Sequence, residues 1–256
     1  MSGRIELPAG LELVVLERAA GARDEAVRRA RDGAEEGTLV WVHHVDDPRA
    51  RAGRAWIVGQ APGLHAALVL RPGLPARDCA QLGPVAAIAL GRALSTVVEP
   101  MTELHYRWPN DVLLDGGKVA GVWLDGEGDA DCIDWLVVSW AVNTEATPES
   151  LGFDAAALQS DGAAGAVDHA ALLQAVAREL VSAIGTWDEA GFEPLLKSWR
   201  GRLALGGAIH LDLGDGNHVA GIAEALDEDG GLSVRANASA HRVTLERFFG
   251  LPEASP

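Results

Sequence analysis

Apolar positions along the chain fall into short runs with the spacing of strands and into longer runs with the spacing of helices. The strand-like runs are rich in Val, Leu and Trp, which suit a pleated, half-buried surface. They predict strands at 11–18, 38–42, 63–70, 104–107, 112–114, 119–124 and 133–142. The helix-like runs predict helices at 23–31, 80–98, 170–184 and 192–199, with Asp168 as a cap for the third. The polar, irregular stretches 43–56 and 146–167 are predicted to be loops.

The last quarter of the chain has a different pattern, with short strands separated by tight turns. Strands are predicted at 208–213, 218–226, 232–235 and 241–244, and turn residues fill 215–217 and 227–231. This turn spacing is typical of a small SH3-like barrel. The glycine-bounded segment 201–207 is predicted to be a hinge. We therefore expect an α+β protein with two domains, 1–200 and 201–256, of which the first folds without the second.

The most informative stretch is 107–124, which reads RWPNDVLLDGGKVAGVWL. Two apolar runs flank Asp115-Gly116-Gly117, residues that tolerate positive φ, so a hairpin is predicted. Pro109 lacks a backbone donor and favours an extended residue before it, which makes a rigid corner ahead of the first strand. Taken singly, Asp111 and Lys118 fit an ordinary hairpin, as a turn cap and a solvated strand end.

Taken together, Trp-Pro-Asn-Asp, a short hairpin and Lys-x-x-Gly resemble the central signature of the biotin protein ligase family. That signature is usually Lys-Trp-Pro-Asn-Asp followed by Lys-hydrophobic-x-Gly, so Arg107 stands here in place of Lys. The resemblance implies a mixed β-sheet catalytic domain of the biotin/lipoate ligase type, followed by an SH3-like domain. It also implies that residues of this motif contact substrate or nucleotide: Arg107, Trp108, Asn110, Asp111, Lys118 and Gly121.

Two further segments resemble the same family. The family's arginine loop, Gly-Arg-Gly-Arg-x-Gly-Arg followed by Trp, corresponds to 48–56, where the matching residues are Arg49, Arg51, Gly53, Arg54 and Trp56. Convergent guanidinium groups suit a phosphate. The family's strand ending Gly-x-Gly-hydrophobic-Asn corresponds to 139–143, where Asn143 is kept. On the residues alone, Asn143 fits a strand-end turn equally well.

The resemblance implies a two-step reaction. Biotin carboxylate attacks the α-phosphorus of ATP, and a lysine of a carboxylase's biotin-carrier domain then displaces AMP. The resemblance implies ATP and Mg²⁺ as cofactors and biotin as the substrate. Lys118 and Arg51 would be catalytic, because two anions that react together need cationic donors between them. The other matching residues would bind substrate or nucleotide, and no residues form a protein metal site.

Several positions depart from the family pattern and leave the ligand open. The Ser-Thr-Asn motif expected after the first strand is replaced by 20–24, AGARD. Ser139 and Ala141 stand where the family has glycines, as do Pro48 and Ala50 in the arginine loop. Two alternatives follow. The acyl acid is lipoate or octanoate, or the chain is a ligase-like protein that binds a small-molecule acid or a partner without catalysis.

Composition narrows the partners. The formal net charge of −16 disfavours DNA and membrane surfaces, so neither is a predicted partner. No apolar run approaches the roughly 20 residues that span a membrane. Cys79 and Cys132 lie far apart and match no metal spacing, and no signal peptide is evident, so a reduced cytoplasmic protein is expected. The oligomeric state is left open, with a homodimer as one alternative.

Overall fold

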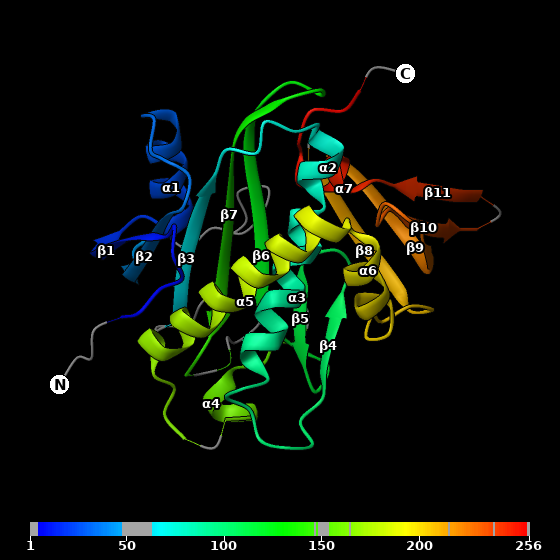
Figure 1. The fold of residues 1–256 in the computed structure, drawn as a ribbon. Helices are drawn as coiled ribbons and strands as arrows, with labels where there is room; N and C mark the ends of the chain where they lie inside the picture. The colour runs from blue at the N-terminus through cyan, green and yellow to red at the C-terminus, as the bar shows by residue number, and fades with distance from the viewer. Residues whose placement is uncertain are drawn as a thin grey trace.

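A computed structural model describes residues 5–47, 63–145, 147, 154–163, 165–214, 216–237 and 239–254. The chain forms a seven-stranded mixed sheet in the order β1-β2-β3-β7-β6-β5-β4 (Figure 1). Its strands are β1 (Glu12–Ala19), β2 (Thr38–Val45), β3 (Gly63–Leu70), β4 (Leu104–Arg107), β5 (Asp111–Leu114), β6 (Gly117–Gly128) and β7 (Ile133–Asn143). β1 and β2 are parallel, and every other neighbouring pair is antiparallel. The predicted mixed sheet is confirmed.

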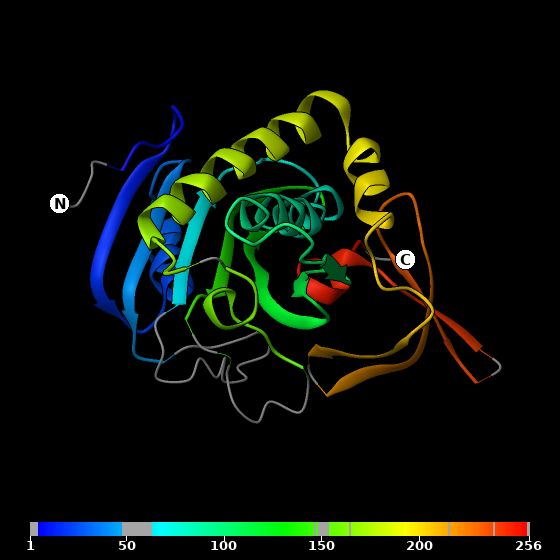
Figure 2. The same ribbon diagram turned by 90° about the horizontal axis from the view of Figure 1, so that it is seen from below.

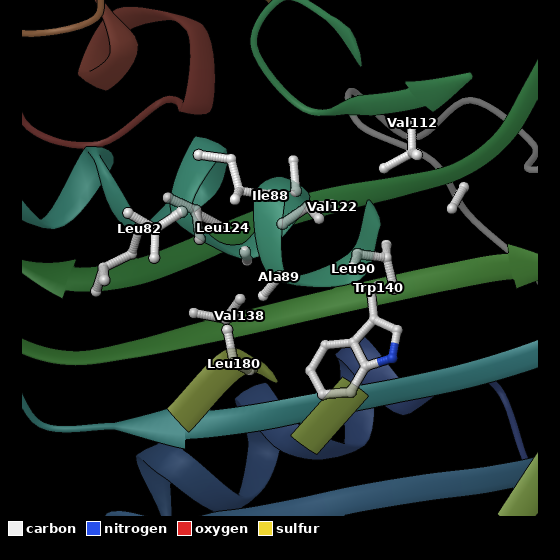
Figure 3. Close-up of a cluster of buried hydrophobic side chains, with 14 of the residues drawn as sticks. Leu82, Ile88, Ala89, Leu90, Val112, Val122, Leu124, Val138, Trp140 and Leu180 are labelled. Atoms are coloured by element: carbon white, nitrogen blue, oxygen red, sulfur yellow. The ribbon is translucent and has the colours of Figure 1, made fainter. Parts of the chain in front are cut away.

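Two sets of helices cover opposite faces of this sheet. Because side chains alternate along a strand, Val40 and Val42 of β2 lie on the face of α1 (Ala22–Arg31), in one core cluster. Leu39 and Trp41 lie on the other face, in the larger cluster with α3 (Leu82–Leu94) and α5 (His169–Ala190). Figure 3 shows this larger core, with Ile88 of α3 and Leu180 of α5 beside Val122 and Val138 of the sheet.

The remaining elements are short. They are α2 (Ala76–Ala80), α4 (Leu158–Asp161), α6 (Glu193–Arg200) and α7 (Leu245–Phe249). The sequence predicted a loop from residue 43, but β2 continues to Val45 because it pairs with β1 as far as Ala19. The single helix predicted at 80–98 is wrong at both ends, since α3 stops at Leu94 and α2 precedes it. Asp168 caps α5 by accepting hydrogen bonds from the N–H groups of Ala170 and Ala171, as predicted.

The C-terminal residues form a second sheet, called the C-terminal unit below together with α7. It is four-stranded and antiparallel, in the order β11-β10-β9-β8 (Figure 2). The strands are β8 (Ala208–Gly214), β9 (Asn217–Leu226), β10 (Leu232–Ala236) and β11 (Ser239–Val243). The predicted strands are confirmed, and the sheet is compatible with an SH3-like domain. Within the described residues, no pairing of β8 with β11 closes it into a barrel.

The two sheets share one core. Leu211 and Val234 of the C-terminal unit belong to the same buried cluster as α3 and β6. The segment after α6 also runs beside β4, where Tyr106 donates its N–H to the Arg202 carbonyl at 2.9 Å and accepts from the Ala204 N–H at 3.1 Å. The boundary between 1–200 and 201–256 stays a prediction. These hydrogen bonds attach 202–204 to β4 and disfavour a freely moving hinge at 201–207. Among the described residues, no helix is both long and apolar enough to cross a membrane.

Candidate active site

The predicted hairpin around Asp115 and Gly116 is present, and both residues have positive φ, of 46° and 88°. These values suit the tight turns that match the twist of an antiparallel pair. The corner before the hairpin contains a cis peptide between Trp108 and Pro109. β5 starts at Asp111, directly after the corner, and β6 returns beside it.

Residues that the sequence places far apart meet on one face of the sheet. The register aligns one residue from each of five neighbouring strands: Arg107, Asp111, Gly121, Ala141 and His65. Directly opposed residues point to the same side of a sheet. This row lies on the α1 face. Ala67 is two residues after His65 on β3, and Val137 is four residues before Ala141 on β7, so each points to the same side as its row residue. Both belong to the α1 cluster. The structure thus brings together Arg107, Asp111 and Gly121, three of the predicted site residues.

A bulge adds Lys118 to the same face. Leu113 pairs with Lys118, whereas Val112 pairs with Ala120, so β6 has one extra residue at this point. Without it, positions 118 and 121 would point to opposite sides, because their separation is odd. With it, a Cβ on Gly121 would stand 3.2 Å from both Cε and Nζ of Lys118. Glycine at 121 therefore leaves room for the lysine side chain.

The Lys118 ammonium is held between an acid and an aromatic ring. Its Nζ donates to Asp111 Oδ1 at 2.5 Å, and the two side chains are 12% and 13% exposed. The Trp123 ring centroid lies 5.9 Å from Nζ, within range of a cation–π interaction. Arg107 Nη1 lies 3.9 Å from the other Asp111 oxygen. Lys118 and Lys197 are the two lysines of a chain whose other cationic side chains are arginines.

Asn143 lies at the end of β7, one strand away from Lys118. It is 3% exposed, and its Nδ2 donates to the carbonyls of Ala156, at 3.0 Å, and Lys118, at 3.4 Å. Both neighbours are acceptors, so the amide nitrogen must face them and Oδ1 must face away. Oδ1 is buried without a hydrogen-bond partner among the described residues. An unpaired buried acceptor is unfavourable unless a ligand supplies the donor.

Asn110 and Trp108 use their polar atoms within the protein. Asn110 is 7% exposed, and its Nδ2 donates to the Val122 carbonyl at 2.7 Å. Trp108 is 3% exposed, and its Nε1 donates to the Gly230 carbonyl in the C-terminal unit at 2.8 Å. The predicted contact of Trp108 with substrate or nucleotide stays a prediction, and its indole N–H faces the C-terminal unit. Both residues hold the corner that precedes Asp111.

A pocket opens on the same face, beside the start of α1. Its cavity volume is about 30 Å³, and the space that also includes its open mouth is about 390 Å³. His65, Trp123, Ser139 and Ala141 line its sheet side, and residues 21–24 line the other. Sequence reasoning did not single out His65 or Arg23 as site residues. The signal for His65 was the alternation of β3, which places it on the α1 face with Ala67.

Arg23 occupies the region where the family's Ser-Thr-Asn motif was expected. Its Nε and Nη2 donate to the two oxygens of Asp125 on β6 at 2.6 and 2.5 Å. This fork-to-carboxylate pair is a strong, directional contact. The hydrogen bonds to Asp125 outweigh the opposing effect of burial and raise the pKa of Arg23. Arg23, fixed by Asp125, therefore lines the pocket opposite Ser139 and Ala141.

His65 makes the stability of this region sensitive to acid. Burial lowers the pKa of its imidazole to about 4. The unfolded chain binds this proton near pH 6.5, so between about pH 6.5 and 4 it holds more protons than the folded chain. We therefore expect the free energy of unfolding to fall as the pH drops through this window. Urea titrations of wild type and His65→Gln should show a weaker pH dependence in the variant. The control variant is His241→Gln, at an exposed position, and it should keep the pH dependence of wild type. If the free energy of unfolding depends on pH equally in His65→Gln and wild type, the lowered pKa of His65 is contradicted.

Arg49, Arg51, Gly53, Arg54 and Trp56 all lie outside the described residues. Their predicted roles stay predictions.

The comparisons with known proteins agree with the motif. Residues 7–201 match the model of the Biotin/lipoate A/B protein ligase family, which covers well over half of the chain. The chain belongs to this family. A biotin–[acetyl-CoA-carboxylase] ligase from Paracoccus denitrificans is 35% identical over 208 residues, covering 79% of this chain and 86% of the relative. In this family, then, the chain has a relative of similar length that is named as a ligase.

Solved structures of the biotin/lipoate ligase family support the fold over nearly the whole chain. A biotin protein ligase-like protein of unknown function from Silicibacter sp. TM1040 has a TM-score of 0.77 and 25% identity, covering 94% of this chain and 97% of that one. The biotin protein ligase from Aquifex aeolicus, in complex with biotin and ATP, has a TM-score of 0.74 and 21% identity. It covers 91% of this chain and 95% of that one. The latter likeness bears on fold alone.

Proposed function

We propose that this chain is an ATP-dependent ligase that activates biotin as biotinyl-adenylate and transfers the acyl group to a lysine of a carrier protein. The proposal rests above all on Lys118. Its ammonium is largely buried, held by Asp111, and lies on the same sheet face as Asn143 and the pocket. The names of the family relatives support this choice of reaction.

In the first step, a carboxylate oxygen of the acid attacks the α-phosphorus of ATP. The bond to the β-phosphate breaks, and pyrophosphate leaves with the bonding electrons. Two anions must approach each other, and a fixed ammonium between them lowers their repulsion more than water does. This stabilisation is greater in the transition state than in the ground state. Lys118 fits this role, since a lysine ammonium is a compact charge with three donors. Asp111 would keep it aimed at the face where the acid binds.

Asn143 would bind the nucleotide. Its buried Oδ1 is an acceptor without a partner among the described residues, and an amino or hydroxyl group of ATP would satisfy it. The pocket between α1 and β7 would take the acyl chain, because Trp123 and Ala141 supply apolar surface there. Arg49, Arg51 and Arg54 are proposed to neutralise the phosphate, with Arg51 catalytic. Gly53 and Trp56 are proposed to bind substrate or nucleotide, and Arg107 to add positive charge near Asp111.

Mg²⁺ is expected to arrive with the phosphates of ATP, which commonly supply its ligands. The described residues contain no group of three His, Cys, Asp or Glu side chains that would hold a metal. Asp111 is engaged by Lys118, and the Asn110 amide nitrogen by Val122. These residues do not form a protein site for the ion, and no step is assigned to it.

In the second step, a neutral lysine amine of the carrier attacks the acyl carbon. AMP leaves, and the amine loses a proton as the amide forms. The Paracoccus denitrificans relative is named for acetyl-CoA carboxylase. We therefore propose the biotin-carrier domain of a carboxylase as the partner.

The pocket also favours a second candidate, in which the acid is lipoate or octanoate. Ser139 and Ala141 add side-chain atoms to the sheet side of the pocket, and Arg23, held by Asp125, lines the other side. A narrower pocket suits the unbranched chain of octanoate, or the single ring of lipoate, better than the fused bicyclic ring of biotin. The same residues are compatible with a chain that binds an acid without activating it.

One experiment separates these candidates. Purified protein with MgATP is given biotin, lipoate or octanoate in separate reactions, and pyrophosphate release is measured. Calorimetric titration with each acid runs beside it. We expect biotin to give the fastest release and the tightest binding. If pyrophosphate is released with lipoate or octanoate but not with biotin, that acid is the substrate. If an acid binds but no acid gives pyrophosphate release, the non-catalytic candidate is favoured. A biotin-carrier domain is then added, and a mass increase on its lysine reports transfer.

A further inference from the structure

The indole of Trp108 joins the corner before Asp111 to the C-terminal unit. Its Nε1 donates to the Gly230 carbonyl, in the turn between β9 and β10. Its ring also packs edge-on against Phe248 of α7, with a centroid distance of 5.1 Å and an interplanar angle of 72°. An aromatic edge contact and a buried hydrogen bond together fix both the place and the rotation of the ring.

The surface that receives Trp108 is itself firmly held. Phe248 is followed by Phe249, whose ring fills the space where Gly83 of α3 has no side chain, since a Cβ there would stand 2.2 Å from the ring. A Cβ on Gly230 would come within 2.9 Å of Leu245 and 3.0 Å of Phe192. The turn and α7 are thus packed against the helices, and they form a fixed support for the indole.

On its other side the corner is held by β6. The Asn110 side chain donates to the Val122 carbonyl at 2.7 Å, and the Asn110 carbonyl accepts from the Val122 N–H at 3.0 Å. Asp111 follows directly and holds Lys118 Nζ at 2.5 Å. A short path of buried contacts therefore leads from the C-terminal unit through Trp108 and Asn110 to the Asp111–Lys118 ion pair.

We propose that Trp108 is a positioning residue, which uses the C-terminal unit as a support to hold Asp111 and Lys118 in place for catalysis. This inference rests on the proposed role of Lys118 in adenylate formation. Trp108 contacts Gly230 and Phe248, so it acts on Lys118 through the intervening residues. A misplacement of about 1 Å in a reacting group costs on the order of 10²-fold in rate, so even partial loosening of this corner has a measurable effect.

The test compares two single changes that each remove one indole N–H. Trp108→Phe keeps an aromatic ring against Phe248 but deletes the donor to Gly230. Trp187→Phe is the matched control, because Trp187 Nε1 donates to Gln81 Oε1 at 2.8 Å, away from the site. We expect Trp108→Phe to lower kcat for pyrophosphate release about tenfold, with KM for ATP and acid unchanged within about twofold. Trp187→Phe should leave both constants at wild-type values.

A second readout does not depend on activity. Labelling with ¹⁵N,¹³C-lysine gives side-chain NMR signals from Lys118 and Lys197 alone, since the chain has no other lysine. Trp108→Phe should shift and broaden the Lys118 signal and leave that of Lys197 unchanged. Trp187→Phe should move neither. Phe248→Leu, which keeps the N–H bond and removes the ring contact, should shift the Lys118 signal in the same direction and carries the test if Trp108→Phe does not fold.

The outcomes separate the two proposals. A Trp108→Phe protein with wild-type kcat and an unchanged Lys118 signal would overturn the positioning role. So would equal losses in Trp108→Phe and Trp187→Phe, because these would reflect general destabilisation. If wild type releases no pyrophosphate with any acid, the proposed reaction fails, and the Lys118 signal alone then decides whether Trp108 positions the ion pair.

Discussion

Replacing Lys118 with methionine is expected to slow acid-dependent pyrophosphate release by on the order of 10²–10³-fold, the loss typical when one donor that stabilises transition-state charge is deleted. Methionine keeps the unbranched shape of the side chain and removes the ammonium. The assay is pyrophosphate release at saturating ATP and biotin.

The same change should also affect stability. Lys118 is 12% exposed and paired with Asp111, which would be left largely buried with Arg107 3.9 Å away. A buried polar group that loses its hydrogen-bond partner costs about 1–3 kcal/mol, and we expect a melting temperature lower by about 2–4 °C for each kcal/mol. A surface lysine would be neutral within about 0.5 kcal/mol. Lys197, exposed on α6, provides that control as Lys197→Met.

Lys118→Arg should recover little of the lost rate. The space beside Nζ exists because Gly121 has no Cβ, and it fits a compact ammonium. A planar guanidinium is larger and presents its donors as a fork, so it cannot take the same place between carboxylate and phosphate. If Lys118→Met and wild type release pyrophosphate at equal rates, Lys118 is not catalytic. Full activity in Lys118→Arg would instead show that charge alone is needed.

Elements of the fold could be predicted from the sequence when the residues that determine them lie close together in the chain. The hairpin at Asp115 and Gly116 was predictable because turn chemistry lies within a few residues. The short helix α7 was missed, since five residues are too few to show a helical period. A signal for it existed, because Thr244 caps its start and Gly250, with φ of 72°, ends it.

The site shows the same limit more sharply. The motif marked Asp111 and Lys118, but strict alternation would put Lys118 and Gly121 on opposite faces. The bulge in β6 that brings them together depends on pairing with β5 and has no local signature. His65 and Ala141 become neighbours only because β3 lies beside β7, an order that local patterns do not determine. Trp108 precedes a proline corner outside any strand, so no period predicted that its indole would face the C-terminal unit.

Residues 1–200 expressed alone are expected to lose cooperative melting and all pyrophosphate release. The turn spacing of 201–256 suggested a separable domain, yet its sheet completes the core of the first. Phe248 and Phe249 are each 7% exposed and pack on Trp108 and α3, and Leu232 is fully buried. Without them Trp108 would face water, and β4 would lose its two backbone bonds to 202–204 and become an open edge.

The free energy lost on truncation is large enough to unfold residues 1–200. Each large apolar side chain that loses its burial forfeits about 1.5–3 kcal/mol, and a domain's whole stability is about 5–15 kcal/mol. Uncovering Trp108, which packs on Phe248, and Phe192, which lies beside Gly230, therefore removes a large share of it. Near-ultraviolet circular dichroism and a melting curve report the outcome. The control is a chain ending at Glu253, which keeps the buried Leu251 and should match wild type. Cooperative melting of 1–200 near the wild-type temperature would show that the first domain is complete without the second.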